Sequence, residues 1–313
     1  MAMDVLEWAA AVAAAVALAI LWIAEALFPL FQHGRNSGRK ARHFALAGMN
    51  AGVATFFSGM TLAVVTLGDK MDWGLLRWLY PEGLAENVGS AGVVVLWGLV
   101  ALVLLDGWHY VFHVLAHKAP LLWKLHAVHH TDPDVDVTTA LRFHCGEIGI
   151  QCLMSLPVYL LLGVEMTHIL LYNLVLLPVA LFHHANVNVP ERVDRALRWL
   201  IVTPRMHIVH HSKWTPETDS NFAAVLSIWD RVFGTFRQRP DPRTIDLGLD
   251  GFSPQHVHQL RGMLTQPVSG EKSEHGSPPD PAHLPPRKRQ PPAPPSPSSQ
   301  ASWGKPTSAN DPA

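Results

Sequence analysis

The chain has 313 residues, of which 49% belong to the apolar types Ala, Val, Ile, Leu, Met, Phe, Trp, Tyr and Cys and 16% are charged. Two cysteines are too few for a disulfide scaffold, and this apolar content excludes a chain that is disordered throughout. Because 24 Lys and Arg face 25 Asp and Glu, giving a formal net charge of −1, no basic field would attract nucleic acid, and we expect no nucleic-acid partner.

The first 185 residues contain apolar runs that could cross a bilayer, for which about 20 residues are enough. Three runs are predicted transmembrane helices: 5–31, 44–67 and 91–108. The runs 148–164 and 167–182 are shorter, and each contains a proline, Pro157 or Pro178. Hydropathy leaves open whether they are thin spans or a re-entrant hairpin. The predicted fold class is an all-α integral membrane protein with about four transmembrane helices, or three and a re-entrant hairpin.

The charges between these runs indicate an orientation. The loop after the first run carries Arg35, Arg39, Lys40 and Arg42, and basic residues collect on the cytoplasmic side of a membrane. The loop 68–90 instead mixes both charge signs with Trp and Tyr, as at an interface. The sequence therefore predicts a cell-membrane protein with its N-terminus outside and its third span ending in the cytoplasm.

Changes in composition divide the chain into four predicted segments. They are an N-terminal transmembrane region, 1–103; a histidine-rich catalytic domain, 104–240; a C-terminal extension of a cytoplasmic helical cap, 241–264; and a Pro-rich tail, 265–313. The tail holds 13 of the 25 prolines. Such a composition cannot bury enough apolar surface to offset its ordering entropy, so we expect the tail to be disordered.

Histidines are concentrated in the predicted catalytic domain, and many of them have helical spacing. Three clusters have separations of three or four residues, which place the imidazoles on one face of a helix. The clusters are His109, His113 and His117; His126, His129 and His130; and His207, His210 and His211. Imidazoles from separate helices suit iron, copper or zinc, and the clusters hold more ligands than one ion can use. The spacing therefore predicts two metal ions in the cytoplasmic cap.

Further motifs accompany the three clusters. They are Asp106 and Tyr110 before His113, Trp123 before His126, Thr203 and Pro204 before His207, the pair Asn221 and Phe222, and the run from Ser227 to Thr235. Two smaller matches are Arg142, His144 and Glu147, and His184 with Asn186. On these residues, the segment from Leu104 to Phe236 resembles the sterol desaturase and fatty acid hydroxylase superfamily, whose members are integral-membrane di-iron oxygenases.

The resemblance implies two Fe²⁺ ions as cofactors, O2 as co-substrate and a set of nine ligands. The implied ligands are His113, His117, His126, His129, His130, His184, His207, His210 and His211, with His144 as a weaker candidate. Asp106, Glu147 and Asn186 are candidates to support these ligands. For Asp106, the two interpretations are a carboxylate that orients an imidazole and a charge at the helix end.

This sequence departs from the family pattern at three positions. Val114 stands where the family usually has an arginine, and His109 and His183 are additional histidines. We expect these two to support ligands or to lie at the membrane interface rather than to bind metal.

Oxidation of a lipid follows from such a site. An unactivated C–H bond has no acidic proton and no leaving group, so redox chemistry at a metal is needed to attack it. We expect O2-dependent hydroxylation or desaturation of a membrane lipid, such as a sterol or a fatty acyl chain. The sequence has no Gly-rich dinucleotide loop after a predicted strand and no cytochrome-like domain, so a reductase, ferredoxin or cytochrome is the expected electron donor.

Two alternative functions are weaker. A membrane zinc hydrolase also uses histidine ligands, but the sequence has no His-Glu-x-x-His motif. A non-catalytic heme-binding or metal-binding membrane protein would place its histidines in the middle of the spans, whereas these fall at helix ends.

Overall fold

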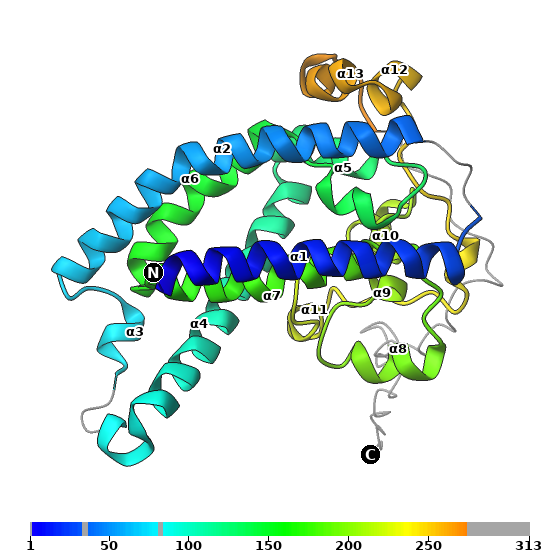
Figure 1. Cartoon of the computed structure of the whole chain (residues 1–313). Coiled ribbons are helices and arrows are strands. Elements are labelled where there is room, and N and C mark those ends of the chain that lie inside the picture. Colours follow the sequence, from blue (N-terminus) through cyan, green and yellow to red (C-terminus); the bar gives the residue numbers. More distant parts are fainter. Residues whose placement is uncertain (1, 33–36, 81–83, 274–313) are drawn as a thin grey trace, which may run out of the picture.

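The computed structural model describes residues 2–32, 37–80 and 84–273, and every regular element within these ranges is a helix. Five helices are long and apolar enough to cross a membrane (Figure 1). They are α1 (Ala2–Leu27), α2 (Ser37–Lys70), α4 (Leu84–Lys118), α6 (Cys145–Leu162) and α7 (Met166–His184). The predicted all-α class is confirmed for the described part of the chain.

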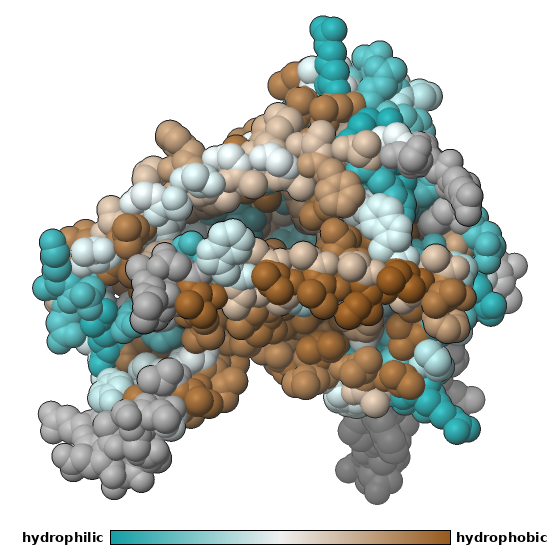
Figure 2. Space-filling view, in the orientation of Figure 1, coloured by the Kyte–Doolittle hydropathy of each residue, from teal (hydrophilic) through white to brown (hydrophobic). Residues whose placement is uncertain are grey.

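The long helices expose apolar side chains as a lipid-facing surface does. Trp8 on α1 is 73% exposed, Phe56 on α2 is 75% exposed and Val95 on α4 is 63% exposed. Figure 2 shows hydrophobic side chains gathered along α1, with hydrophilic ones toward the two ends of the molecule. Water-soluble proteins rarely leave so large an apolar area uncovered, so this surface indicates a bilayer around the helices.

The two short apolar runs form separate helices, α6 with 18 residues and α7 with 19, each continuing past its internal proline. They meet in a tight turn at Gly163, whose φ of 67° is left-handed. A Cβ atom on Gly163 would collide with the backbone of Gly74, which also has a positive φ, 124°. The α6–α7 turn therefore packs against the loop after α2, beside α3 (Leu75–Trp78).

Short helices gather at the opposite end, where α4 finishes and α6 begins (Figure 1). They are α5 (Pro120–His130), η1 (Val137–Leu141), α8 (Glu191–Leu197), α9 (Pro204–His210), α10 (Thr215–Thr218), α11 (Ile228–Val232), η2 (Pro242–Thr244), α12 (Pro254–His258), α13 (Leu260–Thr265) and η3 (Gln266–Val268). Several begin with proline at the first or second position, where its missing N–H costs no helical hydrogen bond. We call this assembly the cap.

The cap continues beyond the predicted start of the tail at Thr265. Gln266 is buried in η3, and its Oε1 lies 3.5 Å from the hydroxyl of Thr131 at the end of α5. The predicted boundary is therefore too early. The rest of the predicted tail, residues 274–313, lies outside the described residues, as does Arg35 of the basic loop.

The remaining basic residues after the first span lie in α2, which begins at Ser37 rather than at Phe44 as predicted. Arg39 is buried and ion-paired with Asp132, at 2.6 Å, and with Asp136. Burial alone would raise the pKa of Asp132, but the charges of Arg39 and Arg142 outweigh burial and hold that pKa well below its usual range. These ion pairs fix the start of α2 to the cap.

Candidate metal centre

All nine histidines that the resemblance implies as ligands come together in the cap, where they form two groups. Within each group, one ring nitrogen from every histidine lies within 4.8 Å of the others. The first histidine group is His113, His117, His126, His130 and His210, and the second histidine group is His129, His184, His207 and His211. Helices α4, α5 and α9 supply the first group. Helices α5, α7 and α9, with the residue after α9, supply the second.

The distances between ring nitrogens fit a shared ion in each group. In the order His129, His184, His207 and His211, successive Nε2 atoms are 3.2, 3.0 and 3.2 Å apart. One pair of Nε2 atoms in the first group is also 3.2 Å apart. Imidazoles bound to one ion at about 2.0–2.1 Å have their nitrogens roughly 2.8–3.4 Å apart when the angle between them is octahedral or tetrahedral. The donor set and its spacing therefore fit a metal ion.

Several of these nitrogens are buried without a hydrogen-bond partner among the described residues. They include both ring nitrogens of His130, Nε2 of His117 and Nε2 of His210. A buried polar atom without a partner costs about 1–3 kcal/mol, and a bound cation would remove this cost. The unpaired nitrogens are thus the second observation that fits a metal.

The opposite ring nitrogens are held in place by oxygen atoms. Nδ1 of His126 lies 2.7 Å from Oε1 of Glu147. The same atom of His113, His184 and His210 lies 2.8, 2.7 and 2.7 Å from the backbone oxygens of Phe222, Ala180 and Ser220 respectively. Since a carbonyl oxygen only accepts, Nδ1 carries the hydrogen, and Nε2 is left with a free lone pair. Glu147 thus lies beside His126, one of the histidines that the resemblance implies as ligands.

Burial keeps the histidines of the cap neutral. It lowers the pKa well below the usual value, and the neighbouring imidazoles lower it further, in His129, His130, His207, His210 and His211. Only a neutral imidazole has a lone pair for a metal, so the site is prepared for binding at neutral pH.

Asp106 has a different role from the predicted ones. Its buried carboxylate hydrogen-bonds to no imidazole in the described part of the chain. It accepts hydrogen bonds from the backbone N–H of Val225 (3.1 Å) and Leu226 (2.8 Å), the indole of Trp229 (2.9 Å) and the hydroxyl of Tyr172 (3.0 Å). Asp106 therefore fastens the segment after the third histidine cluster to α4.

Asp230, in the closing signature, holds the same segment from the other side. Its carboxylate accepts from the backbone N–H of Phe222 (2.7 Å) and Ala223 (3.1 Å) and from the hydroxyl of Thr235 (2.7 Å). Burial raises its pKa to about 6. Because the carbonyl of Phe222 is the oxygen that faces Nδ1 of His113, the signature positions the His113 imidazole through the backbone.

Asn221 connects the signature to the third histidine cluster. Its φ of 53° is left-handed, a conformation that asparagine tolerates better than most residues. The side-chain amide donates to the backbone oxygens of Met206 (2.9 Å) and Arg237 (2.8 Å), and its oxygen accepts from the N–H of Arg237 (2.8 Å). Asn221 thus links α9 to the chain after the signature.

Asn186 also acts on the backbone. Its side chain accepts from the N–H of Phe31 (2.8 Å) and donates to the Phe31 oxygen (2.9 Å). Glu25 accepts from the N–H of Asn186 (2.7 Å) and of Val137 (2.6 Å). The end of α1 is thereby fixed two residues after His184, and Asn186 contacts the backbone of Phe31 rather than the imidazole of His184.

The remaining candidate histidines lie outside the two groups. His144 caps α6 by accepting from the N–H of Gly146 (3.0 Å), and its Nε2 lies 3.1 Å from the oxygen of Leu264. His183 packs beside His207, with ring centroids 4.2 Å apart. His109 lies one turn before His113, with Nδ1 3.3 Å from the oxygen of Leu105. Val114 lies in an apolar cluster with Tyr110 and so offers no replacement for the arginine of the family.

An apolar cavity of about 260 Å³ reaches both histidine groups. His113 and His126 of the first group and His129, His184 and His207 of the second line it. Most of the other lining residues are apolar, namely Phe112, Ala140, Phe143, Ile148, Leu176, Leu177, Ala180, Ala223 and Ala224. They come largely from α4, α6 and α7, which are membrane-span candidates. The cavity could therefore bring an apolar molecule from the bilayer to the histidines.

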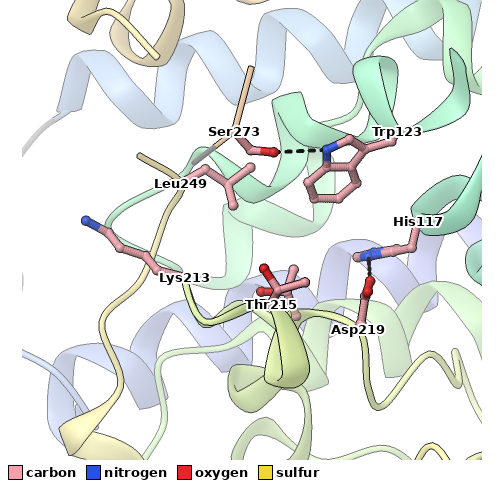
Figure 3. A pocket seen from close by; sticks show the side chains of 8 residues that line it. His117, Trp123, Lys213, Thr215, Asp219, Leu249 and Ser273 are labelled. Atoms are coloured by element: carbon pink, nitrogen blue, oxygen red, sulfur yellow. Dashed lines mark hydrogen bonds and ion pairs between the residues drawn. The ribbon is translucent and has the colours of Figure 1, made fainter. Parts of the chain in front are cut away.

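A second, more polar pocket of about 220 Å³ reaches His117 from another side (Figure 3). In this view His117 points toward Asp219, and its Nδ1 lies 3.4 Å from Oδ1 of that residue. Lys118 pairs with the other oxygen of Asp219 at 2.7 Å. Trp123 also lines the pocket, and its ring centroid is 5.0 Å from that of His117. The first histidine group is thus close to water here.

The sequence analysis missed Asp219 and Glu25. Asp219 follows His211 by eight residues in a loop, where no helical period relates it to His117. Glu25 is an isolated charge in an apolar run. An acidic residue within a predicted membrane span is the sequence signal that could have identified it, because such residues usually have a function.

Fold and site together define a helical protein in which two buried histidine groups lie where the apolar helices meet the cap. Residues 98–235 match the family model described as fatty acid hydroxylase. This segment belongs to that family, within the sterol desaturase and fatty acid hydroxylase superfamily, and the resemblance stated from the motifs is confirmed.

Several named relatives match part of the chain. An ornithine lipid hydroxylase from Rhizobium tropici is 33% identical over 172 residues, which are 55% of this chain and 50% of the relative. Human alkylglycerol monooxygenase is 32% identical over 136 residues, 42% of this chain and 28% of the relative. A cholesterol 25-hydroxylase-like protein from Danio rerio is 30% identical over 166 residues, 50% and 62% of the two chains. The chain thus spans half or less of the length of the first two, and no solved structure matches it.

Proposed function

We propose that the protein is a membrane-bound oxidoreductase that uses two iron ions, O2 and electrons from a separate donor to oxidise a membrane lipid. The observation that carries this proposal is the pair of buried histidine groups, open to one apolar cavity. The nine histidines of the two groups are the proposed ligands. Matches to lipid hydroxylases and monooxygenases favour hydroxylation over desaturation.

When bound, the two iron ions would supply the redox chemistry with O2 that no protein side chain has. Hydroxylation balances when one oxygen atom enters the C–H bond and the other leaves as water, with two electrons and two protons taken up. The electrons come from the separate donor, which we propose to be a reductase, a ferredoxin or a cytochrome.

The chain's own residues position the reaction. Glu147 and the carbonyls of Phe222, Ala180 and Ser220 hold four imidazoles with Nε2 directed inward. Fixing the second ring nitrogen in this way orients a ligand and raises its basicity. The apolar wall of the cavity excludes water from the oxidised carbon. The more polar pocket at His117 and Asp219 instead gives water access to the first histidine group.

We propose that all five long helices cross the membrane, with the N-terminus outside and the cap in the cytoplasm. With five crossings, the loop after α2 and the turn between α6 and α7 would both lie outside. The contact between Gly74 in that loop and Gly163 in that turn, at the end away from the cap, supports this arrangement. Arg39, Lys40 and Arg42, which indicate the cytoplasmic side, lie at the cap end. An odd number of crossings then places the start of α1 and the cap on opposite sides of the membrane.

A zinc hydrolase and a heme protein make different predictions for the purified protein. About two irons per chain would support the oxygenase, one zinc without iron would support a hydrolase, and a Soret band would support heme.

The experiment that tests the proposal compares membrane lipids from a strain that produces the full chain with those from a strain that lacks it. We expect a lipid that gains one oxygen atom from ¹⁸O2 in the producing strain only. His129→Ala, from the second group, and His210→Ala, from the first, should each abolish this product. Leu153→Ala, at an exposed position of α6, is the matched control and should retain it. Full product formation by both histidine variants would contradict the proposal.

A further inference from the structure

Two polar side chains in the apolar cavity have no part in the metal centre. His109 and Gln151 both line the cavity, on α4 and α6 respectively, and both lie within membrane-span candidates. The family pattern does not account for His109, which is an additional histidine. Polar side chains within a membrane segment are costly, and when they face a cavity they mark a path or a binding site.

Both residues lie at the same depth, one helical turn from the histidine groups. Helix α4 runs toward the cap and α6 runs away from it. His109 precedes His113 by four residues, and Gln151 follows Glu147 by four, so each is about 6 Å along its helix from a residue of the metal centre. Trp108 donates to the hydroxyl of Ser155 at 2.8 Å, which fixes the two helices together beside this level.

The hydrogen-bonding capacity of the two side chains is defined. Nδ1 of His109 lies 3.3 Å from the backbone oxygen of Leu105, and because that oxygen only accepts, Nδ1 carries the hydrogen. In a neutral imidazole Nε2 is then an acceptor. The carboxamide of Gln151 can both donate and accept, and it forms no hydrogen bond with the protein in the described part of the chain. Together they match a group that donates one hydrogen bond and accepts another.

We propose that His109 and Gln151 bind a hydroxyl or amide group of the lipid substrate and so place a carbon close to that group at the histidine centre. This inference rests on the proposed function and specifies its substrate class. The substrate is a lipid with an O–H or N–H group, oxidised within a few bonds of that group rather than at the far end of its chain. The rest of the cavity is apolar and accepts the hydrocarbon part.

Binding of two matched probes tests the inference independently of catalysis. The probes are 1-hexadecanol, which donates and accepts a hydrogen bond, and its methyl ether, which only accepts. Both are titrated into the purified full chain in detergent and measured by native mass spectrometry. Since the alcohol gains one hydrogen bond over the ether, we expect it to bind about fivefold to tenfold more tightly.

Variants identify the residues responsible. His109→Phe removes the acceptor for the hydroxyl hydrogen and should bring the preference for the alcohol close to unity without changing iron content or binding of the ether. Gln151→Leu removes the donor to the oxygen that both probes share, so it should weaken binding of both probes without changing iron content. His109→Gln retains an acceptor and should keep part of the preference, and Gln151→Asn retains a donor and should keep part of the binding of both probes. These two polar variants control for a folding defect in the apolar ones. Leu153→Ala, exposed on α6, is the control and should behave as the wild type.

Equal binding of the two probes by the wild type, an unchanged preference in His109→Phe, or unchanged binding of both probes by Gln151→Leu would overturn the inference even if the protein is an oxygenase. The position of the new oxygen gives a second test in the wild type, by fragmentation of the ¹⁸O-labelled lipid. Oxygen within a few bonds of a hydroxyl or amide supports the inference, and oxygen at the methyl end overturns it. Loss of all oxidation with the alcohol preference intact would instead contradict the proposed function alone.

Discussion

Replacement of Asp106 by alanine separates an anchor for the closing segment from a residue that orients a ligand. The substitution leaves the backbone N–H groups of Val225 and Leu226 buried without an acceptor and also removes the partner of the Trp229 indole. A buried donor without a partner costs about 1–3 kcal/mol, so the two backbone groups alone give about 4 kcal/mol of destabilisation. For a chain of this size, that should lower the midpoint of thermal unfolding by about 8 °C or more.

The assay is thermal unfolding of the purified protein in detergent, with iron content measured on the same samples. Asp106→Asn should lose less stability than Asp106→Ala, because the amide oxygen still accepts. Asp69→Asn is a matched control: Asp69 is an exposed acid paired with Arg77, and its loss should change stability by about 0.5 kcal/mol or less. An Asp106→Ala protein as stable as the wild type but depleted of iron would refute the anchoring role, because the carboxylate would then act on a ligand.

Three further outcomes are expected. Glu147→Leu should weaken metal retention about tenfold to a hundredfold in a chelator competition, because His126 loses the oxygen that holds its Nδ1. Glu147→Gln should weaken metal retention less. Equal retention in both variants and the wild type would contradict this role of Glu147. Asn221→Ala should lower the free energy of unfolding by about 2 kcal/mol in denaturation experiments. Asn221→Gly relieves the strain of the left-handed φ but does not restore the lost hydrogen bonds, so it should recover only part of this loss. Full recovery in Asn221→Gly would assign the effect to backbone strain alone. The metal-free protein should lose stability as pH falls below about 6.5, by up to about 1.4 kcal/mol per pH unit for each buried histidine. The reason is that the pKa of these histidines is lowered in the folded state, so the unfolded state binds protons first. A constant unfolding midpoint between about pH 7.5 and 5.5 would contradict their burial as neutral rings.

The sequence was most informative where a period or a motif determined the structure. Spacings of three and four residues placed the members of each cluster on one helical face, and the structure brings these clusters together. The family resemblance added His184, which lies 55 residues from its neighbour His129 and has no such spacing. Long apolar runs predicted three of the five long helices, because length and hydropathy alone determine this property, whereas hydropathy left open whether the two shorter runs, which form α6 and α7, are spans or a re-entrant hairpin.

The sequence was less informative about contacts between distant segments. Asp106 lies one turn before a histidine on the sequence, but its partners are 66 to 123 residues away. The basic residues before the second run looked like loop charges, whereas Arg39 is buried against Asp132 and Asp136. Such pairings depend on how helices pack in three dimensions, which helical periodicity does not specify.

Metal analysis of the purified full chain is the most direct test of the claim that two histidine groups each hold an iron ion. The wild type should contain about two irons per chain, whereas His129→Ala and His210→Ala, each removing a ligand from a different group, should approach one while remaining folded. A wild-type protein with a single zinc and no iron, or variants that both retain two irons, would contradict the account.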